Sequence, residues 1–384
     1  MNRFKCVILQ DIIAPYKSLL FNALEKSMGG DFKVIYFGET DRNRQWRVVK
    51  KELKFPFEVM FEGKTDEASS TKVAAETYRR LNCYDPQVVI IGGYNYFAYW
   101  AALIWARTKK RKVIVIIESH YLDKPRYILK EKVKRLFVSN CNAALVDGTR
   151  HRDYTISLGL KSESIFIKKG TGPVDVSFYQ RAVSRYKNNK IDLCKKLGIP
   201  CNNFIFIGRF SPEKNIISLL RVYKKIKDEV GKGWGLILLG NGLQRKKIED
   251  FINENAVKDI LLPGFKQKEE IPFFYVISDV LILPSVSEPW GLVVAEAMAS
   301  NLPVLVSNRC GCYPDIVYDG INGFSFDPFN DDQLFELMNN VTRGEYNLED
   351  MGKASLQIIK DHTPEKAAEM YLNAINFVMI ESSK

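Results

Sequence analysis

The sequence has no long hydrophobic run. Its longest uninterrupted apolar stretch, Tyr96 to Ala106, spans eleven residues, whereas a membrane-spanning helix needs about 18 or more. The apolar run near the N-terminus, Cys6 to Leu9, stops at Gln10 and is too short for a signal peptide. We therefore expect no spanning helix and a cytoplasmic protein.

Two further patterns are missing. The seven cysteines form no framework, because the close pairs Cys194 with Cys201 and Cys310 with Cys312 have no second pair at metal-ligand spacing. Reduced thiols are expected. The first predicted strand is not followed by Gly-x-Gly-x-x-Gly, because the residues there are Leu9 to Ile13. This argues against a nicotinamide-dependent Rossmann enzyme.

Charge is unevenly distributed along the 384 residues, a length that favours two domains of roughly 180 residues each. Residues 1–190 hold 35 Lys+Arg against 19 Asp+Glu, a net of +16, and residues 191–384 hold 21 against 26, a net of −5. The stretch from Arg107 to Arg135 alone has 11 basic and 3 acidic residues. A basic domain suggests a polyanionic partner, either a membrane surface or a nucleic acid, although solvated helix faces would give the same counts.

Continuous apolar strands alternate with helical patterns twice along the chain, which predicts two doubly wound, Rossmann-like α/β domains with parallel sheets. The polar stretch from Tyr179 to Lys190 is interpreted as the linker, giving an N-terminal domain over 1–185 and a C-terminal domain over 191–363. We expect the ligand beyond the carboxyl ends of the strands, in a cleft between facing domains. The predicted strands are Phe4–Leu9, Phe32–Phe37, Val88–Ile91, Val113–Ile117, Ala143–Val146, Phe204–Ile207, Leu236–Leu239, Ile260–Leu262, Val280–Leu283 and Val304–Val306.

The segment from Ser287 to Ala299 outlines a nucleotide-sugar site. Its loop turns into an Ala-rich helix, which places Gly291, Leu292 and Val293 at a helix N-terminus that suits a diphosphate. Glu296, just inside the helix, could accept from ribose hydroxyls, and Glu288 could face the transferred sugar. A capped helix with two surface glutamates would show the same residues.

Polar residues at other strand ends extend this site. Arg209 and Lys214 follow a predicted strand and could clamp a diphosphate, stabilising the negative charge on a leaving group. Gly240 and Gly242 follow the next strand, where they permit close approach to a nucleotide or simply form turns.

Several of these segments together resemble the family 4 retaining glycosyltransferases with the GT-B fold. The resemblance implies a metal-independent enzyme in which Glu296 holds the ribose, Arg209 and Lys214 the diphosphate and Glu288 the donor sugar, with Phe265 beside the base. It also implies that a last helix, about 364–384, crosses back to the first domain. The matching segments are Gly208–Lys214, Gly240–Gly242, Pro263–Phe265, Glu288–Ala299 and Asn322–Phe324, and, for one branch of the family, Asp11–Tyr16, Asp147–Thr149, Tyr154 and Leu158–Gly159.

The first domain departs from the family in its first loop. Many members carry a Gly-Gly pair where this chain has Ile12 to Tyr16, so donor contacts from this loop are in doubt. His120, at the end of an apolar run, stands where relatives often have a cleft histidine and is a candidate catalytic or structural residue. Tyr16, Tyr94 and His120 are the acceptor-side candidates.

The segment from Arg126 to Phe137 reads as an amphipathic basic helix. It could cover the sheet with a solvated basic face, or also rest on anionic lipid. We interpret it as a peripheral contact with the inner face of the membrane, and therefore favour a lipid-linked saccharide over a soluble or protein acceptor.

The predicted reaction is that of a hexosyltransferase: transfer of a hexose-type sugar from a nucleoside diphosphate sugar to an acceptor hydroxyl with retention, as in cell-surface polysaccharide or glycan assembly. No cofactor is expected, and no metal, because no Asp-x-Asp follows a strand of the second domain. Neither the donor base nor its sugar can be read from the residues. The alternatives are a nucleotide-sugar epimerase or phosphorylase on the same fold and, more remotely, a non-enzymatic nucleic-acid binder; we expect no nucleic-acid partner.

Overall fold

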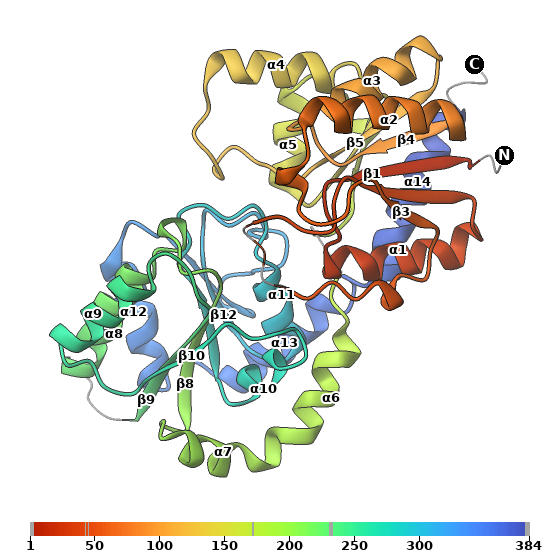
Figure 1. The fold of residues 1–384 in the computed structure, drawn as a ribbon. Helices are drawn as coiled ribbons and strands as arrows, with labels where there is room; N and C mark the ends of the chain where they lie inside the picture. The colour runs from red at the N-terminus through yellow and green to blue at the C-terminus, as the bar shows by residue number, and fades with distance from the viewer. Residues whose placement is uncertain (1–3, 43, 45, 171–172, 230–232, 381–384) are drawn as a thin grey trace. The chain divides into compact units, whose positions relative to one another are not determined.

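The computed structural model describes residues 4–42, 44, 46–170, 173–229 and 233–380. The chain divides into two compact units. Unit 1 runs up to Pro173 and resumes at His362, and unit 2 runs from Val174 to Asp361. Each unit is a parallel sheet covered by helices (Figure 1), so the predicted class of two Rossmann-like α/β domains is confirmed.

Unit 1 has a parallel sheet whose central strands are buried except at Lys112, as continuous apolar runs require. The sequence did not predict β3 and β7. Both are edge strands of three residues, and neither is apolar and buried throughout. In spatial order the strands are β3 (Phe57–Val59), β2 (Phe32–Tyr36), β1 (Cys6–Gln10), β4 (Val88–Ile91), β5 (Lys112–Ile117), β6 (Ala143–Val146) and β7 (Ile165–Ile167).

Helices cover both faces of this sheet. On one face α1 (Pro15–Met28) lies beside α14 (Pro364–Ile380), which also contacts β5, β6 and β7 (Figure 1). Residues 381–384 of the predicted last helix lie outside the described residues. No helix in the described part of the chain has both the length and the apolar character that crossing a bilayer requires. The other face is covered by α2 (Ser70–Tyr84), α3 (Phe97–Thr108), α4 (Ile128–Val138) and α5 (Thr149–Ser157).

Unit 2 repeats the architecture around its own apolar core. Its strands are β10 (Ile260–Gly264), β9 (Trp234–Leu239), β8 (Asn202–Ile207), β11 (Val280–Leu283), β12 (Val304–Ser307) and β13 (Gly323–Phe326), in that spatial order. The sequence missed β13, another short edge strand. The main helices are α8 (Ile216–Glu229), α9 (Arg245–Glu254), α10 (Ile271–Val276), α11 (Leu292–Ala299), α12 (Asp331–Thr342) and α13 (Leu348–Ile359).

The predicted linker is helical. The stretch from Tyr179 to Lys190 belongs to α6 (Val176–Tyr186), a 3-10 turn and α7 (Lys190–Leu197). The boundary between the two units lies earlier in the chain, between Pro173 and Val174. The polar composition was misleading, because α6 buries Tyr179 and packs on α10 and α11. Its start is fixed by Asp175, whose carboxylate accepts from the N–H of Phe178 at 3.0 Å.

Candidate functional site

The predicted donor residues of unit 2 lie where its strand order reverses. In a doubly wound sheet the connections from two neighbouring central strands leave in opposite directions, which opens a crevice at their carboxyl ends. Here those strands are β8 and β11, which pair in parallel. The loop after β8 carries Arg209 and Lys214, and the loop after β11 carries Glu288.

The structure brings Lys214 and Glu288 together as an ion pair between these two loops. Their side chains are 13% and 12% exposed. The loops are also joined by their backbones, because the N–H of Val286 donates to the carbonyl of Glu213 at 2.9 Å. A cation and a carboxylate are thus held side by side at the mouth of the sheet.

Arg209 lies more openly, with half of its side chain exposed. Its guanidinium is 3.5 Å from Glu213, a carboxylate that also accepts from the hydroxyl of Ser211 at 2.6 Å. Burial opposes ionisation of Glu213, but the hydrogen bond from Ser211 and the charges of Arg209 and Lys214 outweigh it and lower its pKa. Sequence reasoning missed Glu213, which tethers Arg209 while leaving donor groups for an anion.

The N-terminus of α11 lets a ligand approach the backbone closely. Gly291 has a φ of 102°, and a Cβ there would lie 3.1 Å from the Leu283 side chain. In the described structure no side chain caps this helix end. The first N–H groups of a helix have no acceptor within it, so those of Leu292 and Val293, both half-buried, meet at this end. The arrangement suits a diphosphate.

Glu296 lies one turn further along α11, partly exposed. The hydroxyl of Tyr275, from α10, is 3.0 Å from Oε2 of this carboxylate. Burial raises the pKa of Glu296, against the opposing effects of hydrogen bonds from Tyr275 and Tyr179 and of the charge on Lys268. Sequence reasoning missed these three neighbours, because Tyr275 lies in an apolar helix and looks like a core residue, while Tyr179 lies in a polar stretch that was interpreted as a linker.

Gly240 and Gly242 are explained by packing between loops. A Cβ on Gly240 would lie 1.9 Å from the carbonyl oxygen of Gly208, and one on Gly242 would lie 2.6 Å from that of Phe210. The N–H of Phe210 donates to the carbonyl of Asn241 at 2.8 Å. The two glycines therefore let the loops after β8 and β9 touch.

Phe265 follows the next strand. The residue is 41% exposed. The loop that carries it is bonded to the loop after β9, since the N–H of Gly240 donates to the carbonyl of Gly264 at 3.0 Å. An exposed aromatic ring at this edge suits stacking on a base.

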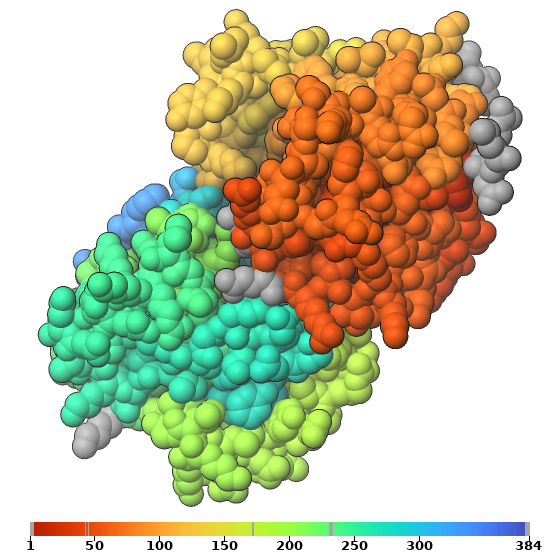
Figure 2. All heavy atoms as spheres, viewed as in Figure 1, coloured from red at the N-terminus to blue at the C-terminus, as the bar shows by residue number. Residues whose placement is uncertain are grey.

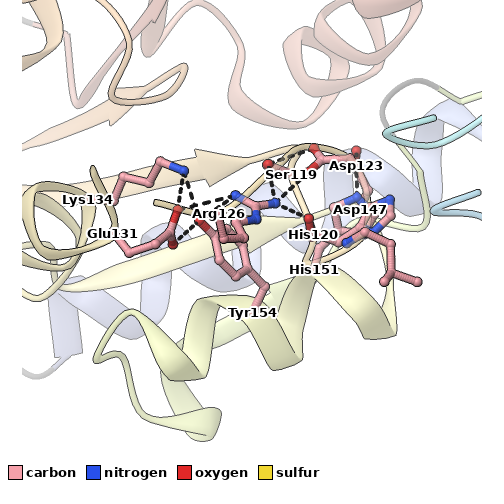
Figure 3. Close-up of polar contacts among 10 residues, drawn as sticks. Ser119, His120, Asp123, Arg126, Glu131, Lys134, Asp147, His151 and Tyr154 are labelled. Atoms are coloured by element: carbon pink, nitrogen blue, oxygen red, sulfur yellow. Dashed lines mark hydrogen bonds and ion pairs between the residues drawn. The ribbon is translucent and has the colours of Figure 1, made fainter. Parts of the chain in front are cut away.

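In unit 1, His120 is fully buried. Its ring lies 5.1 Å from that of His151, edge to face, and its Nδ1 accepts from the N–H of Leu122 at 3.3 Å (Figure 3). The strand-end position had suggested an imidazole open to substrate. The structure instead places the ring inside the unit. A catalytic role for His120 stays a prediction.

Arg126 organises the loop that follows His120. Its guanidinium donates to the carbonyl of His120 and to Asp123, and lies 2.8 Å from the hydroxyl of Tyr154 (Figure 3). That hydroxyl in turn donates to Glu131 at 2.7 Å. Two of the basic residues predicted for the exposed face, Arg126 and Lys134, therefore point into a polar network rather than outward.

The two acceptor-side tyrosines lie apart along the chain of unit 1. Tyr16, at the start of α1, packs edge to face on Trp46 at 6.2 Å, and burial raises its pKa to about 12. Tyr94, after β4, packs near Phe137 with its ring centroid 6.3 Å away. Burial also raises the pKa of Tyr94. Both hydroxyls are therefore neutral donors at ordinary pH.

A buried polar cluster in unit 1 was missed. Glu118 lies 3.0 Å from the ammonium of Lys17 and 3.7 Å from that of Lys168, which also pairs with the fully buried Asp147. Gln10 accepts from Lys17 at 3.0 Å. Apart from Lys17, each residue ends or directly follows a strand, β1, β5, β6 or β7. That repeated position was the signal that could have found them.

Residues 195–357 match the family model of the glycosyl transferases group 1. An uncharacterized glycosyltransferase of Methanocaldococcus jannaschii is 30% identical over 50% of this chain and 53% of its own length. The alpha-monoglucosyldiacylglycerol synthase of Acholeplasma laidlawii is 26% identical over 58% of this chain and 59% of its own. The chain thus spans little more than half the length of these curated relatives.

The fold agrees with this match. The crystal structure of HepE from Anabaena in complex with UDP superposes with a TM-score of 0.74 over 97% of this chain and 100% of the other, at 17% identity. Residues 195–357 are therefore similar to the glycosyl transferases group 1, and the chain has a fold of the GT-B type.

Proposed function

We propose that the protein is a retaining glycosyltransferase that moves a sugar from a nucleoside diphosphate sugar to a hydroxyl of a saccharide acceptor. One observation carries the proposal: the switch point of the unit 2 sheet gathers the Lys214–Glu288 pair, Arg209 and the N-terminus of α11. Glu296 lies one turn along that helix. Cations and helix N–H groups suit a diphosphate, and the carboxylates suit sugar and ribose hydroxyls.

Catalysis would rest on stabilising the leaving group. As the bond from the anomeric carbon to the phosphate oxygen breaks, negative charge builds on the nucleoside diphosphate, where Arg209, Lys214 and the N–H groups of Leu292 and Val293 offset it. The acceptor oxygen bonds to the same face of that carbon. Its proton passes to the departing phosphate, so no protein nucleophile is required, and Glu288 orients the sugar.

Calorimetric titration with UDP, GDP and ADP tests the donor site. Glu296→Ala should lower the affinity for whichever diphosphate binds by about 10-fold or more, since hydrogen bonds to a charged group contribute about 1.5–3 kcal/mol. Glu254→Ala is the matched control, an exposed glutamate at the end of α9. Equal affinity of both variants and the unmodified protein would remove Glu296 from the site.

Product analysis tests the reaction class. A screen of nucleotide sugars followed by NMR of the anomeric proton should show a retained configuration in the product. Conversion of the donor into an epimer, or its phosphorolysis, without any acceptor would instead favour the epimerase or phosphorylase alternative.

For the acceptor, the outward face of α4 is the informative surface. The helix was expected to bury its apolar residues, but Ile128, Leu129, Val133 and Leu136 are 80%, 74%, 48% and 59% exposed. Only Phe137 and Val138 of this helix are buried. Figure 2 shows this part of the chain, in gold, at the surface of unit 1. The apolar face therefore points outward, because the polar network around Arg126 occupies the inward side.

Exposed cations surround this apolar face. We infer that α4 rests on an anionic membrane surface and that the acceptor is a lipid-linked saccharide. Each basic residue near anionic lipid contributes about 1 kcal/mol, and burying a Leu or Ile side chain contributes about 1.5–3 kcal/mol. Apolar insertion and charge thus act together. The exposed basic residues are Lys124, Lys130, Lys132 and Arg135.

Co-sedimentation with vesicles tests this inference. The protein should bind vesicles that contain phosphatidylglycerol and not vesicles of phosphatidylcholine alone. Ile128→Ser with Leu129→Ser should reduce binding about 100-fold, whereas Ile191→Ser with Ile321→Ser, two exposed apolar residues of unit 2, should not. Equal recovery in the supernatant with both vesicle types would contradict the proposal.

A further inference from the structure

The carboxylate of Glu296 is held from beneath by a buried phenol. Tyr275, on α10, is fully buried, and its hydroxyl lies 3.0 Å from Oε2 of Glu296 and 3.1 Å from the carbonyl oxygen of Val293. A tyrosine hydroxyl has one proton, so these two acceptors share it. Tyr275 thus ties the carboxylate to the backbone of the first turn of α11.

A second phenol completes the support. Tyr179, on α6, is 2% exposed, and its ring centroid lies 6.0 Å from that of Tyr275. Its hydroxyl also opposes the rise that burial causes in the pKa of Glu296, and so favours the charged carboxylate. The next residue, Gln180, donates to the carbonyl of Ala299 at 2.6 Å, which fixes α6 along the far end of α11.

Core packing alone does not explain why position 275 carries a hydroxyl. A phenylalanine at position 275 could pack in the core, whereas a buried hydroxyl is costly unless it is hydrogen-bonded. A carboxylate in a partly buried place must likewise be oriented and kept charged to accept from a ligand. The groups that oppose the rise in the pKa of Glu296 are the hydroxyls of Tyr275 and Tyr179 and the ammonium of Lys268, and of these the Tyr275 hydroxyl lies 3.0 Å from the carboxylate.

We propose that Tyr275 is a positioning residue for the nucleotide site: its buried hydroxyl, supported by Tyr179, orients Glu296 toward the ribose hydroxyls of the donor. The inference rests on the proposed function, because it assigns a role to the same carboxylate. Tyr275 itself touches no substrate, so it acts on nucleotide affinity only through Glu296.

A ligand that lacks the ribose hydroxyls separates this role from a structural one. The nucleoside diphosphate that binds the unmodified protein, among UDP, GDP and ADP, is titrated beside its 2′,3′-dideoxy analogue. Tyr275→Phe should lower the affinity for the ribonucleotide about 10-fold and leave the affinity for the dideoxy analogue unchanged. Tyr179→Phe should give the same selective loss at smaller size, and serves if the first variant does not fold.

Tyr223→Phe is the matched control, since Tyr223 is another fully buried phenol of unit 2, whose hydroxyl lies 3.0 Å from the carbonyl of Trp234 instead. It should change neither affinity. Equal weakening of both ligands by Tyr275→Phe, or no weakening of either, overturns the positioning role. Failure of the unmodified protein to bind any of the three diphosphates overturns the donor site itself, and this inference with it.

Discussion

Gly240→Ala should destabilise unit 2 severely, and the reason is geometric. The added Cβ would lie 1.9 Å from the carbonyl oxygen of Gly208 and 3.0 Å from its carbon. That oxygen belongs to the backbone and cannot rotate away, because the N–H of Gly208 is bonded to the carbonyl of Leu239 at 3.0 Å. The loops after β8 and β9 would have to separate.

The size of the effect follows from two contributions. A non-glycine residue at a positive φ costs about 1–2 kcal/mol, and overpacking a closed contact costs about 1–3 kcal/mol more, or above that where nothing can yield. The sum is on the order of 2–5 kcal/mol, or a fall of about 10 °C in the melting temperature of a domain this size. Gly344→Ala is the matched control, since Gly344 has a φ of 74° and nothing within 4 Å of its Cβ, so only the first contribution applies.

Differential scanning calorimetry of both variants, read on the transition of unit 2, measures the difference. Equal melting temperatures for Gly240→Ala and Gly344→Ala would refute the packing argument. A stable Gly240→Ala protein that had lost only its affinity for nucleoside diphosphates would instead show that Gly240 contacts the ligand.

Four further outcomes are expected. Glu296→Gln should raise the melting temperature at pH 8, where burial penalises the charged carboxylate, and this gain should vanish as the pH falls toward the ordinary pKa of glutamate; a gain independent of pH would contradict it. Lys214→Ala should lower kcat by about 100-fold or more in a transfer assay, and an unchanged kcat would exclude Lys214 from charge stabilisation. Turnover should persist in excess EDTA, so activity that EDTA abolishes and manganese restores would overturn the metal-independent mechanism. Arg126→Ala should destabilise unit 1 by about 3–5 kcal/mol in urea unfolding, because the buried carboxylate of Asp123 loses its ion pair while Ser119 still donates to it; an unaltered midpoint would count against the network.

Most of the strands that sequence could predict lie inside a sheet with both faces covered, and the partly buried edge strand β10 is the exception. Continuous apolar runs such as Val88–Ile91 and Val280–Leu283 appear as β4 and β11 with the same bounds. The missed strands β3, β7 and β13 sit at sheet edges and are short. Polar residues interrupt β3 and β13, whereas β7 is apolar but has only three residues.

The candidate donor site was predictable to the extent that its residues follow strands. Parallel strands end at one edge, so polar residues after β8 and β11 had to meet there, and Lys214 and Glu288 do. The supporting tyrosines were not predictable, since Tyr275 lies in the apolar stretch Ile271–Val276 and Tyr179 in a polar stretch that looked like a linker. Their role comes from partners far away in the sequence.

The helix α4 shows the same limit in another form. An amphipathic pattern predicts that apolar and charged residues occupy different faces, but it does not say which face packs inward. In most surface helices burial of the apolar face decides the matter. Here Arg126, Glu131 and Lys134 join Tyr154 in a partly buried polar network, which turns Ile128 and Leu129 outward. Exposed apolar side chains beside cations are costly in water and favourable at a lipid surface. The orientation of α4, rather than its net charge, is therefore the main argument for a membrane contact.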